Sequence, residues 1–191
     1  MAGKETPRQK MINMMYLIFI AMLALNLSKQ ILQSFGTMNE ELTETNVELE
    51  DRNEQFMQGL EEKAIEQAEK YLALKNKADS IRNISTELYG FLESIKEGAF
   101  VSAEEKGIAR SNYSKLDNTA YYTSLFFDGE KYKEAGQEFL NQMNSFRDDF
   151  VQIASADPKL VSIAEEVGSK FSTDDVQVSD GKPRKYLDYH Y

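Results

Sequence analysis

The most pronounced pattern in the sequence is an uncharged apolar run from Met11 to Leu27, flanked by Lys10 and Lys29. With Ser28 it comprises 18 residues, which as a helix span about 27 Å, close to the thickness of the hydrocarbon layer of a bilayer. We therefore predict one transmembrane helix over residues 11–28. A cleaved signal peptide is the alternative, but the run is long for one and no A-x-A cleavage motif follows it.

The helix is expected to begin before the apolar run and to continue beyond it. Thr6 is a suitable N-cap, and Pro7 suits the first helical position. After the run, apolar residues recur every seven positions at Phe35, Leu42, Leu49 and Phe56. This heptad seam is typical of a helix that packs against another helix. The partner can be a second copy of the chain or a later helix of the same chain.

Further stretches with helical spacing predict that the rest of the chain is a helical body. Apolar positions indicate helices over residues 74–95, 132–153 and 160–171, with a break at Asp157-Pro158 between the last two. The predicted fold is therefore all-α, with an anchor helix that continues into an up-and-down helical bundle. The tail does not end like a finished domain, so we expect the natural protein to continue into further domains.

Between the helices predicted over residues 74–95 and 132–153, only short motifs indicate where elements begin and end. Gly98 is expected to end the helix before it, and Ser102 with Glu105 to form the capping box of a short helix reaching about Leu116. Residues 118–128 are rich in aromatic and β-branched side chains. We expect them to form a loop or a short extended piece that ends in a turn at Asp128-Gly129.

Charge gives the predicted orientation in the membrane. The formal net charge is −10, of which residues 1–10 contribute +2 (three basic residues and one acidic), leaving −12 for the chain from Ser28 onward. Positive charge before the span keeps the N-terminus in the cytoplasm. Residues 1–10 are thus predicted to be cytoplasmic, 11–28 to span the membrane, and 29–191 to form a periplasmic helical-bundle domain. Such an acidic body is repelled by phosphate backbones, so nucleic acid is not an expected partner.

The sequence shows no constellation of catalytic or metal-binding residues. There is no cysteine, and the single histidine is His190, next to the last residue. The glutamates that follow the span mostly lie outside the heptad seam and are typical of a solvated helix surface. No glycine-rich phosphate loop is present. We expect no enzymatic activity, no metal site and no cofactor.

The predicted span has one face suited to helix packing. Its members are Asn13, Leu17, Ala21, Ala24 and Ser28. Small residues allow another helix to approach closely, and the amide of Asn13 can form a hydrogen bond across the contact or be hydrated near the interface.

The span also contains no acidic or basic residue, so it cannot carry protons by itself. If the protein serves an ion-driven machine, the protonated acid must belong to another subunit. Arg8, at the cytoplasmic edge, can then be the fixed charge that senses this acid. The ordinary positive-inside preference also explains an arginine at that position.

Residues 4–32 resemble the N-terminus of the GldM/PorM family of Bacteroidetes, inner-membrane components of the machinery for gliding motility and type IX secretion. The resemblance is carried by TPRQKM at residues 6–11 and AMLALN at residues 21–26. FFDGEKYKEAGQEF at residues 126–139 and YLDYHY at residues 186–191 are similar to the first periplasmic domain of that family.

The resemblance implies a proton-driven rotary motor. In that family, two copies of the chain place their single helices inside a pentameric ring of multispan GldL/PorL-type subunits. The periplasmic part then transmits torque to periplasmic and outer-membrane secretion components. Arg8 matches the family arginine that lies near a glutamate of the ring, and Asn13 and Tyr16 lie on the same helix. Members of the family normally continue into several β-rich domains.

Two other functions fit the same pattern of one span and a helical body. A single-pass receptor would have a second span downstream of Tyr191. A passive membrane-tethered scaffold would purify without a multispan partner.

Overall fold

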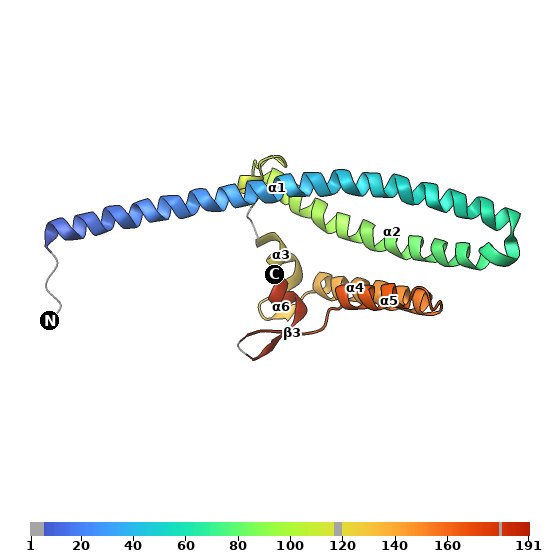
Figure 1. The fold of residues 1–191 in the computed structure, drawn as a ribbon. Coiled ribbons are helices and arrows are strands. Elements are labelled where there is room, and N and C mark those ends of the chain that lie inside the picture. Colours follow the sequence, from blue (N-terminus) through green and yellow to red (C-terminus); the bar gives the residue numbers. More distant parts are fainter. Residues whose placement is uncertain (1–5, 117–119, 180) are drawn as a thin grey trace. The chain divides into compact units, whose positions relative to one another are not determined.

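The structure is a computed structural model that describes residues 6–116, 120–179 and 181–191 (Figure 1). The helices, in chain order, are α1 (Pro7–Glu66), α2 (Ala68–Glu105), the 3-10 helix η1 (Tyr113–Lys115), α3 (Ala120–Phe126), α4 (Glu134–Ser155), α5 (Val161–Lys170) and α6 (Tyr186–His190). Two antiparallel hairpins of two-residue strands complete the fold, β1 (Phe127–Asp128) with β2 (Lys131–Tyr132) and β3 (Val176–Gln177) with β4 (Pro183–Arg184). The predicted all-α class is confirmed.

The chain divides into two compact units. The first unit contains Met1–Asn46 and Ala103–Asn118, and the second contains Val47–Ser102 and Thr119–Tyr191. Both α1 and α2 contribute to each unit. Each unit is described by itself below.

α1 is a single helix of 60 residues, as the unbroken pattern predicts. It begins at Pro7, and the backbone N–H of Gln9 donates to Thr6 Oγ1 at 3.3 Å. The side chain of Thr6 therefore satisfies one of the N–H groups that the first turn leaves free. The apolar run and the heptad seam consequently lie on the same helix.

In the second unit, α2 turns back beside the C-terminal part of α1 (Figure 1). The turn is made at Gln67, whose carbonyl accepts the backbone N–H groups of Lys70 and Tyr71 at 3.0 and 3.1 Å. Lys75 of α2 lies 3.9 Å from Glu61 of α1. Glu61 is exposed and Lys75 is half-buried, so this ion pair contributes little to the stability of the hairpin.

The predicted end of the second helix at Gly98 is wrong, because α2 continues to Glu105. The side chain of Tyr121 packs against Gly98, and a Cβ at this position would overlap the Tyr121 hydroxyl group. The glycine that terminates α2 is Gly107, which lies two residues beyond Glu105 and has a φ of +74°. The N–H of Ile108 donates to the carbonyl of Ala103, and that of Gly107 to the carbonyl of Glu104. These two bonds form a Schellman motif.

Two further predictions between α2 and α4 are corrected. Ser102 and Glu105 do not open a helix, because both lie in the last turn of α2, and only η1 follows before Leu116. The part of segment 118–128 that the structure describes is mostly helical, as α3, because its aromatic rings pack into the core on one side of a helix. Residues 118 and 119 lie outside the described part of the chain.

The predicted turn at Asp128-Gly129 is confirmed. β1 and β2 are joined by Gly129 and Glu130, and Asp128 is the register partner of Lys131. Gly129 has a φ of +62°, which matches the first central position of the type II′ turn common in two-residue hairpins.

The core of the second unit is aromatic and joins α2, α3, α4 and α6. Its fully packed members are Leu88, Phe126, Phe139, Met143 and Leu187. The ring centroids of Phe126 and Phe139 are 5.4 Å apart, within the range for favourable aromatic pairs. Leu187 has no exposed surface, so the last short helix is an integral part of this core.

Gly136 in the first turns of α4 allows this core to close. A Cβ on Gly136 would lie 2.7 Å from the Phe126 carbonyl oxygen and 3.4 Å from Leu187 Cδ1. We expect Gly136→Ala to lower the free energy of unfolding by about 1–3 kcal/mol, because the backbone of Phe126 cannot move away cheaply. Thermal unfolding of the full chain in detergent, followed by circular dichroism, measures the effect.

Gly90→Ala is the matched control for this substitution. Gly90 lies inside α2, and a Cβ there would meet nothing within 4 Å. Alanine is favoured over glycine in a helix interior by up to about 1 kcal/mol, so this variant should melt at the same or a higher temperature. A Gly136→Ala protein as stable as Gly90→Ala would contradict the packing described here.

Candidate functional site: the exposed faces of α1

The first turns of α1 carry Arg8 and Lys10, and no acidic residue is present in the first turn. Cations are disfavoured at a helix N-terminus by the macrodipole. Arg8 therefore does not stabilise the helix, and its presence requires another explanation. Both side chains are exposed.

Asn13 lies one turn further along and is held by a neighbour. The Nε2 group of Gln9 donates to Asn13 Oδ1 at 3.2 Å. Tyr16, three residues on, shares a face with Asn13 and is 64% exposed. Arg8 precedes Asn13 by five positions, so it projects from a different side of the helix. The structure thus places Asn13 and Tyr16 together, with Arg8 at the end of the same helix.

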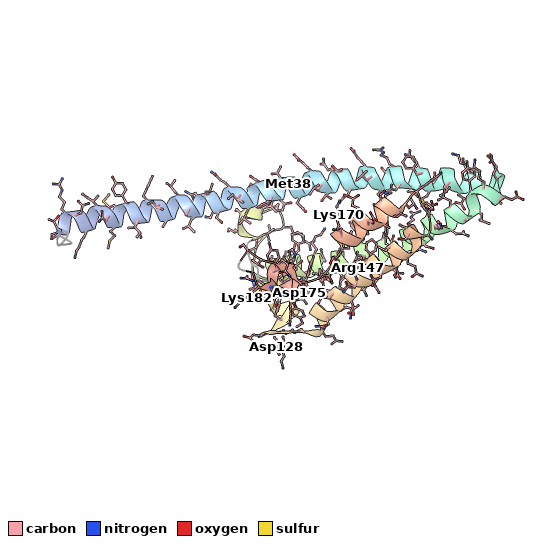
Figure 2. The ribbon with its side chains drawn as sticks, turned by 60° about the horizontal axis from the view of Figure 1, so that its bottom comes forward. Met38, Asp128, Arg147, Lys170, Asp175 and Lys182 are labelled. Carbon is pink, nitrogen blue, oxygen red and sulfur yellow. The ribbon has the colours of Figure 1, made fainter. Side chains whose placement is uncertain are left out.

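The apolar run is exposed on every side of α1. From Met14 to Leu27 the large apolar side chains are 53–69% exposed. Figure 2 shows side chains projecting all around this part of the helix. By length and composition it is the one helix of the described chain suited to crossing a membrane, and none of the apolar window is buried within the protein. This surface requires a lipid or protein environment. The face made of Leu17, Ala21, Ala24 and Ser28 is exposed as well.

The heptad seam is also exposed. Phe35, Leu42, Leu49 and Phe56 are 61, 57, 46 and 70% exposed. Met38, on the same side of α1 and labelled in Figure 2, is 54% exposed. Because an apolar stripe of this length is costly to leave in water, the seam is available to a partner.

One contact in the first unit was not expected from the sequence. The ring of Tyr113, in η1, packs directly on Gly36, where a Cβ would overlap it. Its hydroxyl group donates to Glu40 Oε1 at 3.1 Å. Burial of the hydroxyl and, second, the hydrogen bond to Glu40 raise the pKa of Tyr113. The contact, here called the Tyr113 latch, holds the segment after α2 against α1.

The described residues contain no group of three or more potential metal ligands. His190 is exposed, and the centroid of its ring lies 4.4 Å from that of Tyr186 and 4.9 Å from that of Tyr189. A shallow, open hollow of about 560 Å³ lies between the β1–β2 hairpin and α6, lined by Thr123, Phe127, Gly129, Glu130, Lys185, Asp188 and Tyr191.

Comparison with known proteins identifies a family. The family model for the N-terminal domain of GldM matches residues 30–191, which is well over half of the chain. The match starts just after the predicted span and includes both the heptad seam and the aromatic core. No curated protein matches the chain.

Proposed function

Because the chain belongs to the GldM family, we propose that it is a subunit of a rotary motor driven by the proton-motive force. Membership associates the chain with the machinery of gliding motility and type IX secretion, whose GldM component is not a known enzyme. In the proposal the chain lies in the bacterial inner membrane and transmits torque from it across the periplasm. The observation that carries the proposal is the charge-free helix, exposed on all sides, at the start of α1.

The orientation rests on the charges at the start of α1. Arg8 and Lys10 precede the apolar run and oppose the helix macrodipole, and the positive-inside preference accounts for both. The N-terminus is then cytoplasmic and the helical body periplasmic. The domain boundaries 1–10, 11–28 and 29–191 follow from the same pattern.

The proton site is assigned to a partner. An ion-driven helix needs an ionisable group inside the bilayer, and residues 11–28 carry no acid or base. A multispan subunit of the GldL/PorL type, five per ring, would supply the acid. Arg8 would be the fixed charge that responds to it, and Asn13 and Tyr16 would contact the ring.

The exposed seam supports a homodimer. Phe35, Leu42, Leu49 and Phe56 repeat every seven residues and are exposed, and a coiled coil of two copies would bury them. The apolar run and the seam share one unbroken helix. Rotation of the span would therefore be passed directly to the seam of the dimer.

Copurification with subunit counting tests the proposal. The chain, expressed with the membrane proteins of its own cell, is purified in mild detergent, and native mass spectrometry gives the composition. We expect two copies of this chain with five copies of one multispan subunit. A chain that purifies without any multispan partner would support the scaffold alternative and refute the motor.

A further inference from the structure

An asparagine recurs every seven residues along α1, beside the heptad seam. Its positions are Asn39, Asn46 and Asn53. A spacing of seven keeps these residues on one side of the seam, as it keeps the seam residues in line. The side chain of Asn39 contacts the Tyr113 hydroxyl group. Asn46 and Asn53 lie beyond this contact and are exposed, so this pair, here called the amide column, is available to a second chain.

Two glutamates form a matching column on the other side of the seam. With Leu42 at position a of the heptad, Glu41 and Glu48 occupy position g, and the amide column occupies position e. Both glutamates are exposed. Residues 40–54 contain seven acidic residues and one basic residue, yet position e carries no charge. The seam is therefore flanked by carboxylates on one side and neutral amides on the other.

The Tyr113 latch does not obstruct the seam. Tyr113 contacts Gly36 and Glu40. Successive residues of an α-helix are rotated by about 100°, so these two residues lie on the side of α1 opposite Met38. Met38 is at position d of the heptad and is 54% exposed. A second copy can thus pack on the seam while the latch remains in place.

The two columns complement each other in a parallel dimer. In a parallel, in-register coiled coil, each residue at position g lies beside the residue five positions further along the other strand, at position e. Glu41 would lie beside Asn46 of the second copy, and Glu48 beside Asn53. Two-fold symmetry repeats both pairs, which gives four contacts. Because an amide NH2 group donates to a carboxylate, each glutamate meets a donor rather than another negative charge.

We propose that Asn46 and Asn53 are the specificity-determining residues of the homodimer, and that their amides donate hydrogen bonds to the glutamate column of a second copy. The inference rests on the proposed homodimer and names the groups that allow so acidic a helix to pair with itself. A second copy is the occupant that fits, because the two columns of one chain have the offset of five that parallel pairing requires. A different chain with acids at position e would be repelled.

Substitutions of opposite sign in the amide column test the proposal. The Kd of the dimer of the whole chain is measured by sedimentation equilibrium in density-matched detergent. An exposed charge pair changes an equilibrium constant by about two- to fivefold, and the dimer contains four such contacts. We therefore expect Asn46→Asp/Asn53→Asp to raise the Kd, and Asn46→Lys/Asn53→Lys to lower it, each by about tenfold or more. The gain from lysine should disappear when Glu41→Gln and Glu48→Gln are added.

The matched control is Asn76→Asp/Asn83→Asp in α2, because these two asparagines are also seven residues apart and exposed. It adds the same charge, and its Kd should stay near that of the unsubstituted chain. Circular dichroism reports the helix content of each variant, and the lysine variant decides the question if the aspartate variant is unfolded.

The outcomes separate the amide column from the homodimer itself. A folded aspartate variant that dimerises as well as the α2 control, or lysine substitutions that fail to tighten the dimer, would overturn the proposal. A lysine gain that survives removal of both glutamates would also overturn it, because the pairing would then involve other groups. An unsubstituted chain that sediments only as a monomer would instead refute the proposed homodimer.

Discussion

Arg8→Glu is expected to abolish type IX secretion and gliding while the protein stays in the membrane at its normal level. In the proposed motor, Arg8 faces an acid of the ring, and a reversed charge would repel that acid. An acidic residue near a helix N-terminus is stabilised by the macrodipole by about 0.3–1 kcal/mol. Loss of function therefore cannot come from fraying of α1. Secretion and spreading of a strain that carries only the variant measure the effect.

Lys10→Glu is the matched control, because Lys10 lies in the same turns of α1 and is equally exposed. Like Arg8→Glu, it replaces one positive charge before the span with a negative charge, so any defect in membrane topology would appear in both variants. Protease accessibility of the periplasmic body reports topology. We expect Lys10→Glu to retain most function and Arg8→Lys to retain part of it. A motile, secreting Arg8→Glu strain would show that Arg8 serves topology alone.

The elements that the sequence predicts well are those whose signal is local. The apolar run needs only its own composition to be identified, and Thr6 with Pro7 marks the start of α1 without reference to any other segment. α4 and α5 follow from apolar spacing and the break at Asp157-Pro158, where the N–H of Lys159 donates to Asp157 Oδ1 at 3.0 Å. In each case the residues that determine the element are neighbours in the chain.

The errors concern residues whose role depends on a distant partner. A glycine inside a helix and a glycine that ends a helix cannot be told apart from the sequence alone. Gly98 is inside a helix, where the Tyr121 hydroxyl group occupies the space that a Cβ would need. Leu187 could not be identified as a core residue because a single leucine among tyrosines and charged residues has no periodicity, yet it is completely buried. Tyr113 and Glu40 are 73 positions apart, so no local pattern could reveal the latch.

For the candidate site, the sequence predicts which residues share a helix but not whether their side chains are exposed. The sequence alone places Arg8, Asn13 and Tyr16 on one helix and identifies the seam, and the structure adds that these side chains are exposed. The roles of these residues in a motor remain predictions.

The seam gives the second large expected effect, in the double variant Leu42→Glu/Leu49→Glu. In a dimer these side chains would meet their counterparts, and burying each leucine would contribute about 1.5–3 kcal/mol. Replacing both with glutamate removes that burial and sets like charges opposite each other. We expect the Kd of the dimer to rise at least a hundredfold. Mass photometry of the purified chain in detergent, across a range of concentrations, measures the change.

Val47→Glu is the control for a single substitution, Leu49→Glu. Val47 is 56% exposed, compared with 46% for Leu49, but it lies off the seven-residue repeat. Both changes add one negative charge to the same helix turn, and only Leu49→Glu places it between the strands of the proposed dimer. Because both side chains are exposed in the single chain, neither change should unfold it. Equal dimerisation of the two variants would assign any contact between copies to another surface, such as the face of Leu17 and Ala21.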